Sequence, residues 1–342
     1  MRLSARRPRL LPCLAALSLW CGAACSTPAP PAPAQPAHGS AKTSAQGASQ
    51  PPTQPSAPEA PPAPGPRAAA APTTEAAKAD PPYNLEADRE GRLKLAREDL
   101  GGGTKAIRVA PIFIVAGPSP AVTSSATPFI EAVIAAYTNG RFGKAPAQAI
   151  SIYIFPEPTS YHGFCRKHYG GKECISRFGF YEPNDRKIIM NGGADGTLSH
   201  ELAHPFVETD FPDAPTWINE GIASLFEQPI LGGRGEIHGG KNWRFPRLRN
   251  AMNSAKEDPS IRLETLFTIG DDDFRNGSED LHYAMARYFC QWMDEKGKLW
   301  PFFHAWRDNA KDDPRGEKAF IEVMGKTPKD ASADWRRWLR AL

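Results

Sequence analysis

Three residues of the segment TLSHELAHPF (197–206) have the types and the spacing of a metal site. His200, Glu201 and His204 follow the pattern His-Glu-x-x-His. On a helix, positions i and i+4 lie about 40° apart around the axis and about 6 Å apart along it. Both imidazoles can therefore reach one ion at the distance of about 2.0–2.1 Å that zinc prefers. Glu201 is turned about 100° from His200, so it can act on a water molecule at the open side of the metal.

The same segment is compatible with an ordinary amphipathic helix that carries two histidines. Leu202 and Phe206 would then face a core, and the histidines would lie at the edges of the buried face. A third ligand would separate the two interpretations, because catalytic zinc takes three protein ligands and keeps one position open.

Glu220 is the candidate for this third ligand. It lies 16 residues after His204, in the predicted helix PTWINEGIASLFE (215–227), which leaves room for a short loop and an antiparallel return. A carboxylate among so many apolar neighbours is costly unless it is paired or binds a metal. The alternative is an exposed helical acid, the usual place of glutamate. Asn219, next to it, is suited to orient a metal ligand.

Asp210 is a competing third ligand, six residues after His204. This arrangement would resemble the metzincin pattern, which needs a sharp glycine turn where Val207 stands here. His238 lies in a glycine-flanked loop and is expected to be solvent-exposed.

Three segments together resemble the gluzincin side of the zinc metallopeptidases, the peptidase MA-like proteins: GFYEPNDRKIIMN (179–191), TLSHELAHPFVE (197–208) and PTWINEGIASLFE. The resemblance covers most of 105–342. It implies a zincin-like α+β fold with Zn²⁺ as cofactor, and a small N-terminal sheet with a hairpin packed on the active-site helix. It also implies that His200, His204 and Glu220 are the ligands and that Glu201 is the general base.

Two positions depart from that pattern. Pro205 directly follows the second histidine, so the helix is expected to kink or end there. Ser224 stands where the thermolysin-type proteins carry an aspartate four residues after the glutamate ligand, so the partners of the ligands are expected to be built differently.

The function implied is hydrolysis of a peptide or protein substrate by a zinc-activated water. Tyr283, with His282 and His238 as alternatives, is expected to stabilise the oxyanion. The strand 186–191 is expected to bind an extended peptide by strand addition. The alternative function is a catalytically inactive zincin-like binding lipoprotein at the cell surface.

The order of elements predicts an α+β fold rather than repeating βαβ units. Four strands are expected, at 105–117, 148–155, 176–181 and 186–191, and none after Gly196. Helices are expected at 126–140, 158–171, 197–209, 216–227, 243–255, 280–296, 299–308, 316–325 and 332–341. The acidic segment 270–280 is expected to be a solvated loop, and the aromatic residues of the last helices are expected to pack in the core.

The N-terminal region predicts export. Residues 1–25 have a basic start and a short apolar run that ends in GAAC, which resembles a lipobox with Cys25 as the lipidated residue. Residues 26–82 contain 16 of the 35 prolines and almost no large apolar side chain, so a disordered tether is expected. The metallopeptidase domain is then 83–342, anchored by lipid in the outer membrane or cell envelope.

Composition and cysteines bound the remaining properties. The formal net charge of +3 over 342 residues gives no indication of a nucleic-acid partner, and we expect a monomer. An oxidising compartment would allow Cys165 and Cys174 to pair. Cys290 is left over and is expected to be a buried thiol.

Overall fold

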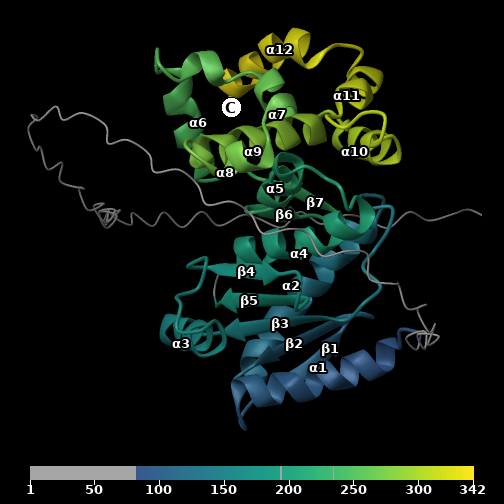
Figure 1. Cartoon of the computed structure of the whole chain (residues 1–342), viewed down its shortest axis with the longest axis vertical. Helices are drawn as coiled ribbons and strands as arrows, with labels where there is room; N and C mark the ends of the chain where they lie inside the picture. Colours follow the sequence, from purple (N-terminus) through teal and green to yellow (C-terminus); the bar gives the residue numbers. More distant parts are fainter. Residues whose placement is uncertain (1–81, 193–194, 234) are drawn as a thin grey trace, which may run out of the picture. The chain divides into compact units, whose positions relative to one another are not determined.

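The computed structural model describes residues 82–192, 195–233 and 235–342. Within this part of the chain, Figure 1 shows a sheet with its covering helices, followed by a group of helices that contains the C-terminus. The expected signal segment, Cys25 and the tether up to residue 81 lie outside the described residues. No helix in the described part is both long and apolar enough to cross a membrane.

The sheet half comprises the elements up to residue 210. They are α1 (Leu85–Leu100), β1 (Lys105–Val109), β2 (Phe113–Gly117), α2 (Pro120–Thr138), β3 (Ile150–Phe155), α3 (Pro158–His168), β4 (Gly179–Glu182), β5 (Lys187–Asn191) and α4 (Asp195–Asp210).

The helical half comprises the elements from residue 216 onward. They are α5 (Thr216–Leu225), β6 (Pro229–Leu231), β7 (Ile237–Gly239), α6 (Arg244–Met252), a short 3-10 turn (Asp258–Ser260), α7 (Leu263–Thr268), α8 (Asp271–Arg275), α9 (Glu279–Glu295), α10 (Leu299–Asp308), α11 (Glu317–Met324) and α12 (Pro328–Ala341).

The five-stranded sheet is mixed, with the order β1-β2-β3-β5-β4. β3 pairs in parallel with β2 and β5, whereas β1 and β4 pair antiparallel to their neighbours. The sheet precedes the helical half, as an α+β arrangement requires. The α+β arrangement was expected, but the sheet also contains a βαβ connection, because α2 joins the parallel strands β2 and β3.

The strand expected at 105–117 is divided into β1 and β2. Ala110 adopts a left-handed φ of 52° between them, and Pro111 lacks the N–H that a continuous strand would use. The chain therefore reverses at this point and forms an antiparallel pair. The strand pair β6 and β7, after Gly196, was also missed, because each strand is only three residues long.

Alternate residues of the sheet enter two separate apolar layers. Ile152 and Ile154 of β3 pack with buried residues of α2 and α4. Tyr153 and Phe155, which point to the other face, pack with residues of α1 and α3. This alternation follows from the two-residue period of a strand, and it fixes α4 against one face of the sheet.

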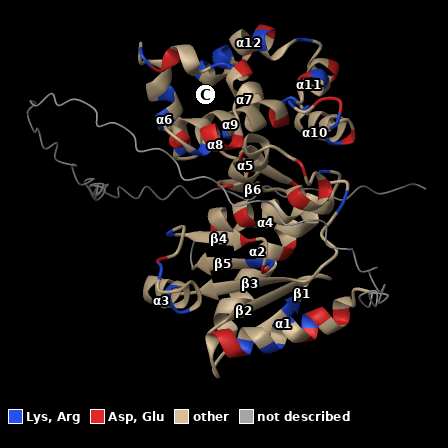
Figure 2. Ribbon diagram, viewed as in Figure 1, with Lys and Arg blue, Asp and Glu red and all other residues tan. Residues whose placement is uncertain are grey.

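α1 is a surface helix that the sequence analysis did not predict. Figure 2 shows acidic and basic residues alternating along it, and only Arg92, Leu93 and Ala96 are buried. The side chain of Asn84 caps its N-terminus by accepting a hydrogen bond from Ala87 N at 3.0 Å. Because so few residues of α1 are buried, its sequence shows almost no helical period of apolar residues.

α4 continues through Pro205 to Asp210, so the proline does not end the helix, and the expected helix over 197–209 is confirmed. Leu198, Leu202 and Phe206 recur every four residues and are buried in the core. This apolar face holds the helix against the sheet. The loss of one backbone hydrogen bond at proline is offset by that packing.

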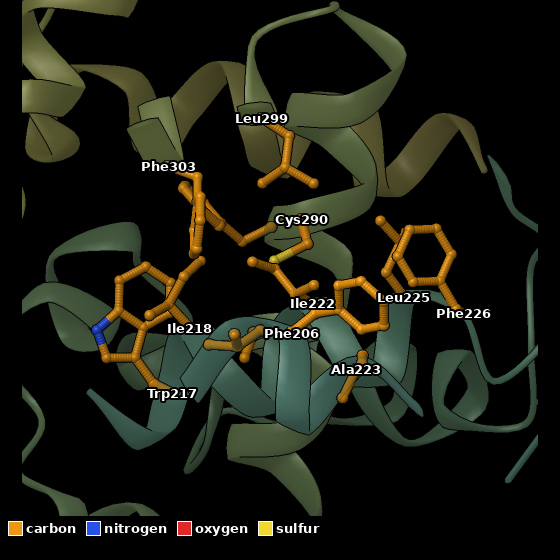
Figure 3. Close-up of a cluster of buried hydrophobic side chains, with 14 of the residues drawn as sticks. Phe206, Trp217, Ile218, Ile222, Ala223, Leu225, Phe226, Cys290, Leu299 and Phe303 are labelled. Atoms are coloured by element: carbon orange, nitrogen blue, oxygen red, sulfur yellow. The ribbon is translucent and has the colours of Figure 1, made fainter. Parts of the chain in front are cut away.

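α5 packs closely on α9 in the core that Figure 3 shows, where Ile218, Ile222 and Cys290 point toward one another. Gly221 makes this approach possible: an added Cβ would lie 2.9 Å from Cys290 Sγ and 3.1 Å from the carbonyl oxygen of Ala286. The position of α5, and of Glu220 on it, is therefore fixed by α9.

The cysteines and the C-terminal aromatic residues lie as expected. Cys165 and Cys174 form a disulfide, and Cys290 is a buried free thiol. The aromatic side chains of the last helices belong to the main core, four of them fully buried and two partly buried: Phe302, Phe303, Trp306, Trp335, Trp300 and Trp338.

Candidate metal centre

α4 brings the two histidines together near the surface of the core. The ring centroids of His200 and His204 are 4.9 Å apart, and the exposed fraction of His200 is only 9%. One ligand atom from each of His200, Glu201 and His204 lies within 4.8 Å of the others. By distance, this group could hold a metal ion.

Glu220 approaches the same point from α5. Its Oε2 atom lies 3.4 Å from His200 Nε2 and 4.0 Å from His204 Nε2. Glu220 is 6% exposed, and Oε2 has no hydrogen-bond partner among the described residues. A buried carboxylate oxygen without a partner is costly, and a cation between it and the two imidazoles would satisfy all three atoms.

Glu201 and Glu220 differ in how their oxygens are used. Glu201 Oε2 lies 3.8 Å from His204 Nε2, but it also accepts a hydrogen bond from Tyr181 N at 2.9 Å. Glu220 Oε1 accepts a hydrogen bond from Arg275 Nη2 at 2.7 Å, which leaves Oε2 facing the imidazoles. Glu220 Oε2 is therefore the carboxylate oxygen without a hydrogen bond beside the two imidazoles, whereas Oε2 of Glu201 is already engaged by the backbone.

The charges around Glu220 keep it ionised. Burial alone would raise the pKa of Glu220, but His204, His200 and Arg275 together lower the pKa well below its ordinary value. Glu220 is thus a carboxylate in this environment, the form that binds a metal.

Asn219 orients His204. The Nδ1 atom of His204 lies 2.9 Å from Asn219 Oδ1. An amide oxygen can only accept, so Nδ1 donates the proton of this hydrogen bond, and Nε2 is the ring nitrogen that faces the shared point. Asn219 was predicted to orient one of the candidate ligands, and His204 is the histidine that it contacts.

Glu227 takes the corresponding place beside His200. Its Oε1 lies 3.6 Å from His200 Nδ1, which is ion-pair range rather than a hydrogen bond. Burial lowers the pKa of His200, but the adjacent carboxylates of Glu220, Glu201 and Glu227 raise it to about 9. The carboxylate beside His200 Nδ1 is therefore that of Glu227, seven residues after Glu220, and not a side chain at position 224.

Glu227 is itself held by two neighbours. Arg244 donates to both carboxylate oxygens at 2.7 and 2.6 Å, and Asn242 Nδ2 donates at 2.8 Å. The first turn of α4 packs against the end of α5 here. Gly196 is required at this contact, because an added Cβ would lie 2.0 Å from the carbonyl oxygen of Glu227.

The strand beside the site is β4 rather than the segment 186–191. β5 is paired on both sides, with β3 and β4, so it cannot accept a further strand, and that expectation was wrong. β4 is an edge strand. Its Tyr181 N–H points outward, toward Glu201, so a peptide added to the sheet would meet the site at β4.

Tyr283 lies in the same cleft, which has a volume of about 650 Å³. Its hydroxyl accepts a hydrogen bond from Arg275 Nη1 at 2.9 Å, and the guanidinium of Arg244 lies 4.7 Å from its ring centroid. Burial and the charge of Glu220 raise the pKa of Tyr283. The hydroxyl therefore keeps its proton at neutral pH and can donate it in a hydrogen bond.

The other candidates lie elsewhere. His238 is exposed on β7, with Nδ1 3.4 Å from an oxygen of Asp294, and His282 Nδ1 lies 3.0 Å from the carbonyl oxygen of Phe274; neither lines the cleft. Asp210 is buried, and its two carboxylate oxygens accept hydrogen bonds from Arg307 Nη1 at 2.8 and 2.9 Å. Asp210 serves as a structural ion pair at the end of α4.

Sequence reasoning missed Glu227, Arg244 and Arg275. Arg275 belongs to α8, in the segment 270–280 that was expected to be a solvated loop. A signal for Glu227 was present, since it lies two helical turns after Glu220 beside the apolar run SLF. No protein-family model matches this chain. No curated protein matches it either.

Proposed function

We propose that this chain is an exported zinc metallopeptidase that hydrolyses peptide bonds, with His200, His204 and Glu220 as metal ligands. One observation carries the proposal: a buried carboxylate oxygen of Glu220 has no hydrogen-bond partner among the described residues and faces two imidazole nitrogens. The succession of a hairpin, a His-Glu-x-x-His helix and a second helix with the glutamate resembles that of the zincin-like gluzincins and supports the proposal.

The donor set fits zinc. Two imidazoles and one carboxylate, with a cleft on the remaining side, are the arrangement of a catalytic zinc with an open position. When bound there, zinc would supply a lowered pKa for water and would polarise the substrate carbonyl. Asn219 and Glu227 would keep the two imidazoles in the orientation that binding needs.

Glu201 is placed to act as the general base. Its carboxylate lines the cleft, and the Tyr181 N–H holds one oxygen. The carboxylate takes a proton from the attacking water as the water oxygen bonds to the carbonyl carbon. It then gives that proton to the amine nitrogen as the C–N bond breaks.

Tyr283 and Arg275 are placed to stabilise the negative charge that develops on the carbonyl oxygen. The Tyr283 hydroxyl accepts from Arg275 and keeps its own proton for donation. A donor fixed in this way needs no rearrangement during the reaction. The edge of β4 would bind the peptide backbone in extended form.

The cellular setting belongs to the same proposal. A disulfide between Cys165 and Cys174 is typical of exported proteins, which agrees with the signal segment read from the sequence. Cys25 would anchor the chain in the outer membrane or cell envelope, with the proline-rich tether between the lipid and the enzyme. A monomer with a peptide or protein substrate is proposed.

The variant Glu201→Gln tests the proposal. It should bind one zinc ion per chain, as the wild type does, and it should lose turnover of an unfolded protein substrate by at least about a hundredfold. A chelator should abolish turnover of the wild type, and added zinc should restore it. Full turnover in the variant would refute the proposal. Zinc and peptide binding without any cleavage by the wild type would favour the inactive binding lipoprotein.

A further inference from the structure

Three large apolar side chains are exposed at the mouth of the cleft. The exposed fractions are 81% for Ile175, 50% for Phe178 and 59% for Trp243, and all three line the cleft that contains the candidate metal centre. Single exposed apolar residues are common, but a group around one cleft points to a binding surface. We call this group the apolar lip.

The first part of the lip is rigid. It directly follows the disulfided Cys174. The hydroxyl of Tyr161 donates to the carbonyl oxygen of Ser176 at 2.6 Å, and Asn191 N donates to the carbonyl oxygen of Phe178 at 2.9 Å. The backbone is thus fastened to α3 and β5 while the side chains of Ile175 and Phe178 remain exposed. Apolar groups held in this way lose little entropy when they bind a ligand.

The second part of the lip comes from the helical half. Trp243 lies between Asn242 and Arg244, and both of these neighbours hydrogen-bond to Glu227. The position of the exposed indole is therefore linked to the carboxylate beside His200. The two parts of the lip belong to different halves of the fold and share one cleft with the candidate metal centre.

The charge of the cleft limits which peptides can bind there. Six carboxylate side chains line it, but only two guanidinium groups do. This excess of negative charge disfavours an acidic peptide. The three side chains of the lip are almost wholly apolar, so the lip favours a ligand that buries apolar surface.

We infer that the apolar lip selects substrates: an extended, non-acidic polypeptide with a large aliphatic or aromatic side chain near the bond to be cut. The inference rests on the proposed function and deepens it. The backbone of the substrate lies along the edge of β4, which ends the sheet next to Glu201. Its large side chain is buried between Phe178, Ile175 and Trp243.

The experiment uses the zinc-loaded Glu201→Gln chain, so that binding is measured without turnover. Two labelled peptides of equal length, which differ only in a central Phe or Ser, are titrated by fluorescence anisotropy. The Phe peptide should bind about tenfold more tightly, as expected for burial of one large side chain. Adding Phe178→Ser or Trp243→Ser should reduce this preference to about twofold or less.

Ile321→Ser provides the matched control, because Ile321 is also exposed, at 42%, but lies on α11 and does not line the cleft. It should leave the preference unchanged, and zinc content and circular dichroism should be the same in all variants. A tenfold preference that persists in Phe178→Ser and Trp243→Ser would overturn the inference.

Failure of the lip and failure of the proposed function give different results. If the wild type cleaves both peptides equally well and the inactive variant binds them equally, substrate selection by the apolar lip is refuted and the proposed peptidase activity is supported. If the preference in binding is present and depends on the lip, but the wild type cleaves neither peptide, the lip is supported and the proposed activity fails.

Discussion

Replacing Glu227 by Gln tests how the candidate metal centre is held together. The amide has nearly the same shape as the carboxylate but no charge, so it keeps the packing and removes the attraction to His200 Nδ1, 3.6 Å away. It also removes the ion pair with Arg244, at 2.6 Å. Two effects should follow, one on metal affinity and one on stability.

The two magnitudes follow from the surroundings of Glu227. Loss of a group that orients a metal ligand costs about 10–100-fold in affinity, which corresponds to about 1.4–2.8 kcal/mol. Removing one partner of a buried ion pair costs about 3–5 kcal/mol. The Arg244 side chain is 21% exposed and can still be hydrated, so we expect about 2–3 kcal/mol for the metal-free protein.

Asp210→Asn separates the two effects. Asp210 is also a buried carboxylate in an ion pair. Its Oδ1 atom lies 2.8 Å from Arg307 Nη1, and the arginine side chain is 19% exposed. Asp210 lies at the far end of α4 from the first turn that Glu227 contacts. Asp210→Asn should lose a similar free energy of unfolding in urea. Its zinc affinity, measured by competition with a chromogenic chelator, should equal that of the wild type.

Two results would contradict the roles assigned to Glu227. If Glu227→Gln and Asp210→Asn have zinc affinities within about twofold of each other, Glu227 does not orient His200. If Glu227→Gln loses zinc affinity without losing stability, the ion pair with Arg244 contributes nothing measurable.

Three further predictions concern other parts of the structure. Asn219→Ala should lower zinc affinity by about tenfold because His204 loses its hydrogen-bond partner; an unchanged chelator competition would contradict this. Gly221→Ala should destabilise the chain by about 1–3 kcal/mol in urea, because the new methyl group lies 2.9 Å from Cys290 Sγ; wild-type stability would contradict the close packing. Burial raises the pKa of Asp88, on α1. Hydrogen bonds from Arg186 and Tyr83 and the charges of nearby arginines outweigh this effect, so the pKa lies below its ordinary value. Since the pKa is lower in the folded state, Asp88→Asn should cost about 2 kcal/mol at neutral pH. The difference should shrink as the pH falls through the folded pKa, and a difference that grows in acid would contradict the assignment.

The proximity of the candidate site residues could be predicted from local spacing. The i, i+4 histidines and a glutamate on the next helix are all within 21 residues of sequence, and helix geometry alone limits where they can point. The helix at 299–308 was confirmed with the same bounds. Such elements combine a helical period with a clear apolar face, and little outside the segment is needed to recognise them.

The missed features depend on contacts between distant segments. Arg275 reaches Glu220 across 55 residues of sequence, and an acidic stretch gives no indication that its one arginine turns inward. The parallel pairing of β3 with both neighbours is another case, because the hydrophobic pattern of a strand does not state its partner. α1 escaped prediction because its buried face is only three residues wide.

The candidate ligands come from both halves of the fold, and this origin has a consequence for how the protein matures. The sheet half alone supplies two imidazoles, and the carboxylate arrives only when α5 has settled against α9. If the site binds zinc as proposed, a partly folded chain, in which α5 has not yet packed on α9, would offer only the two imidazoles and would bind the metal weakly.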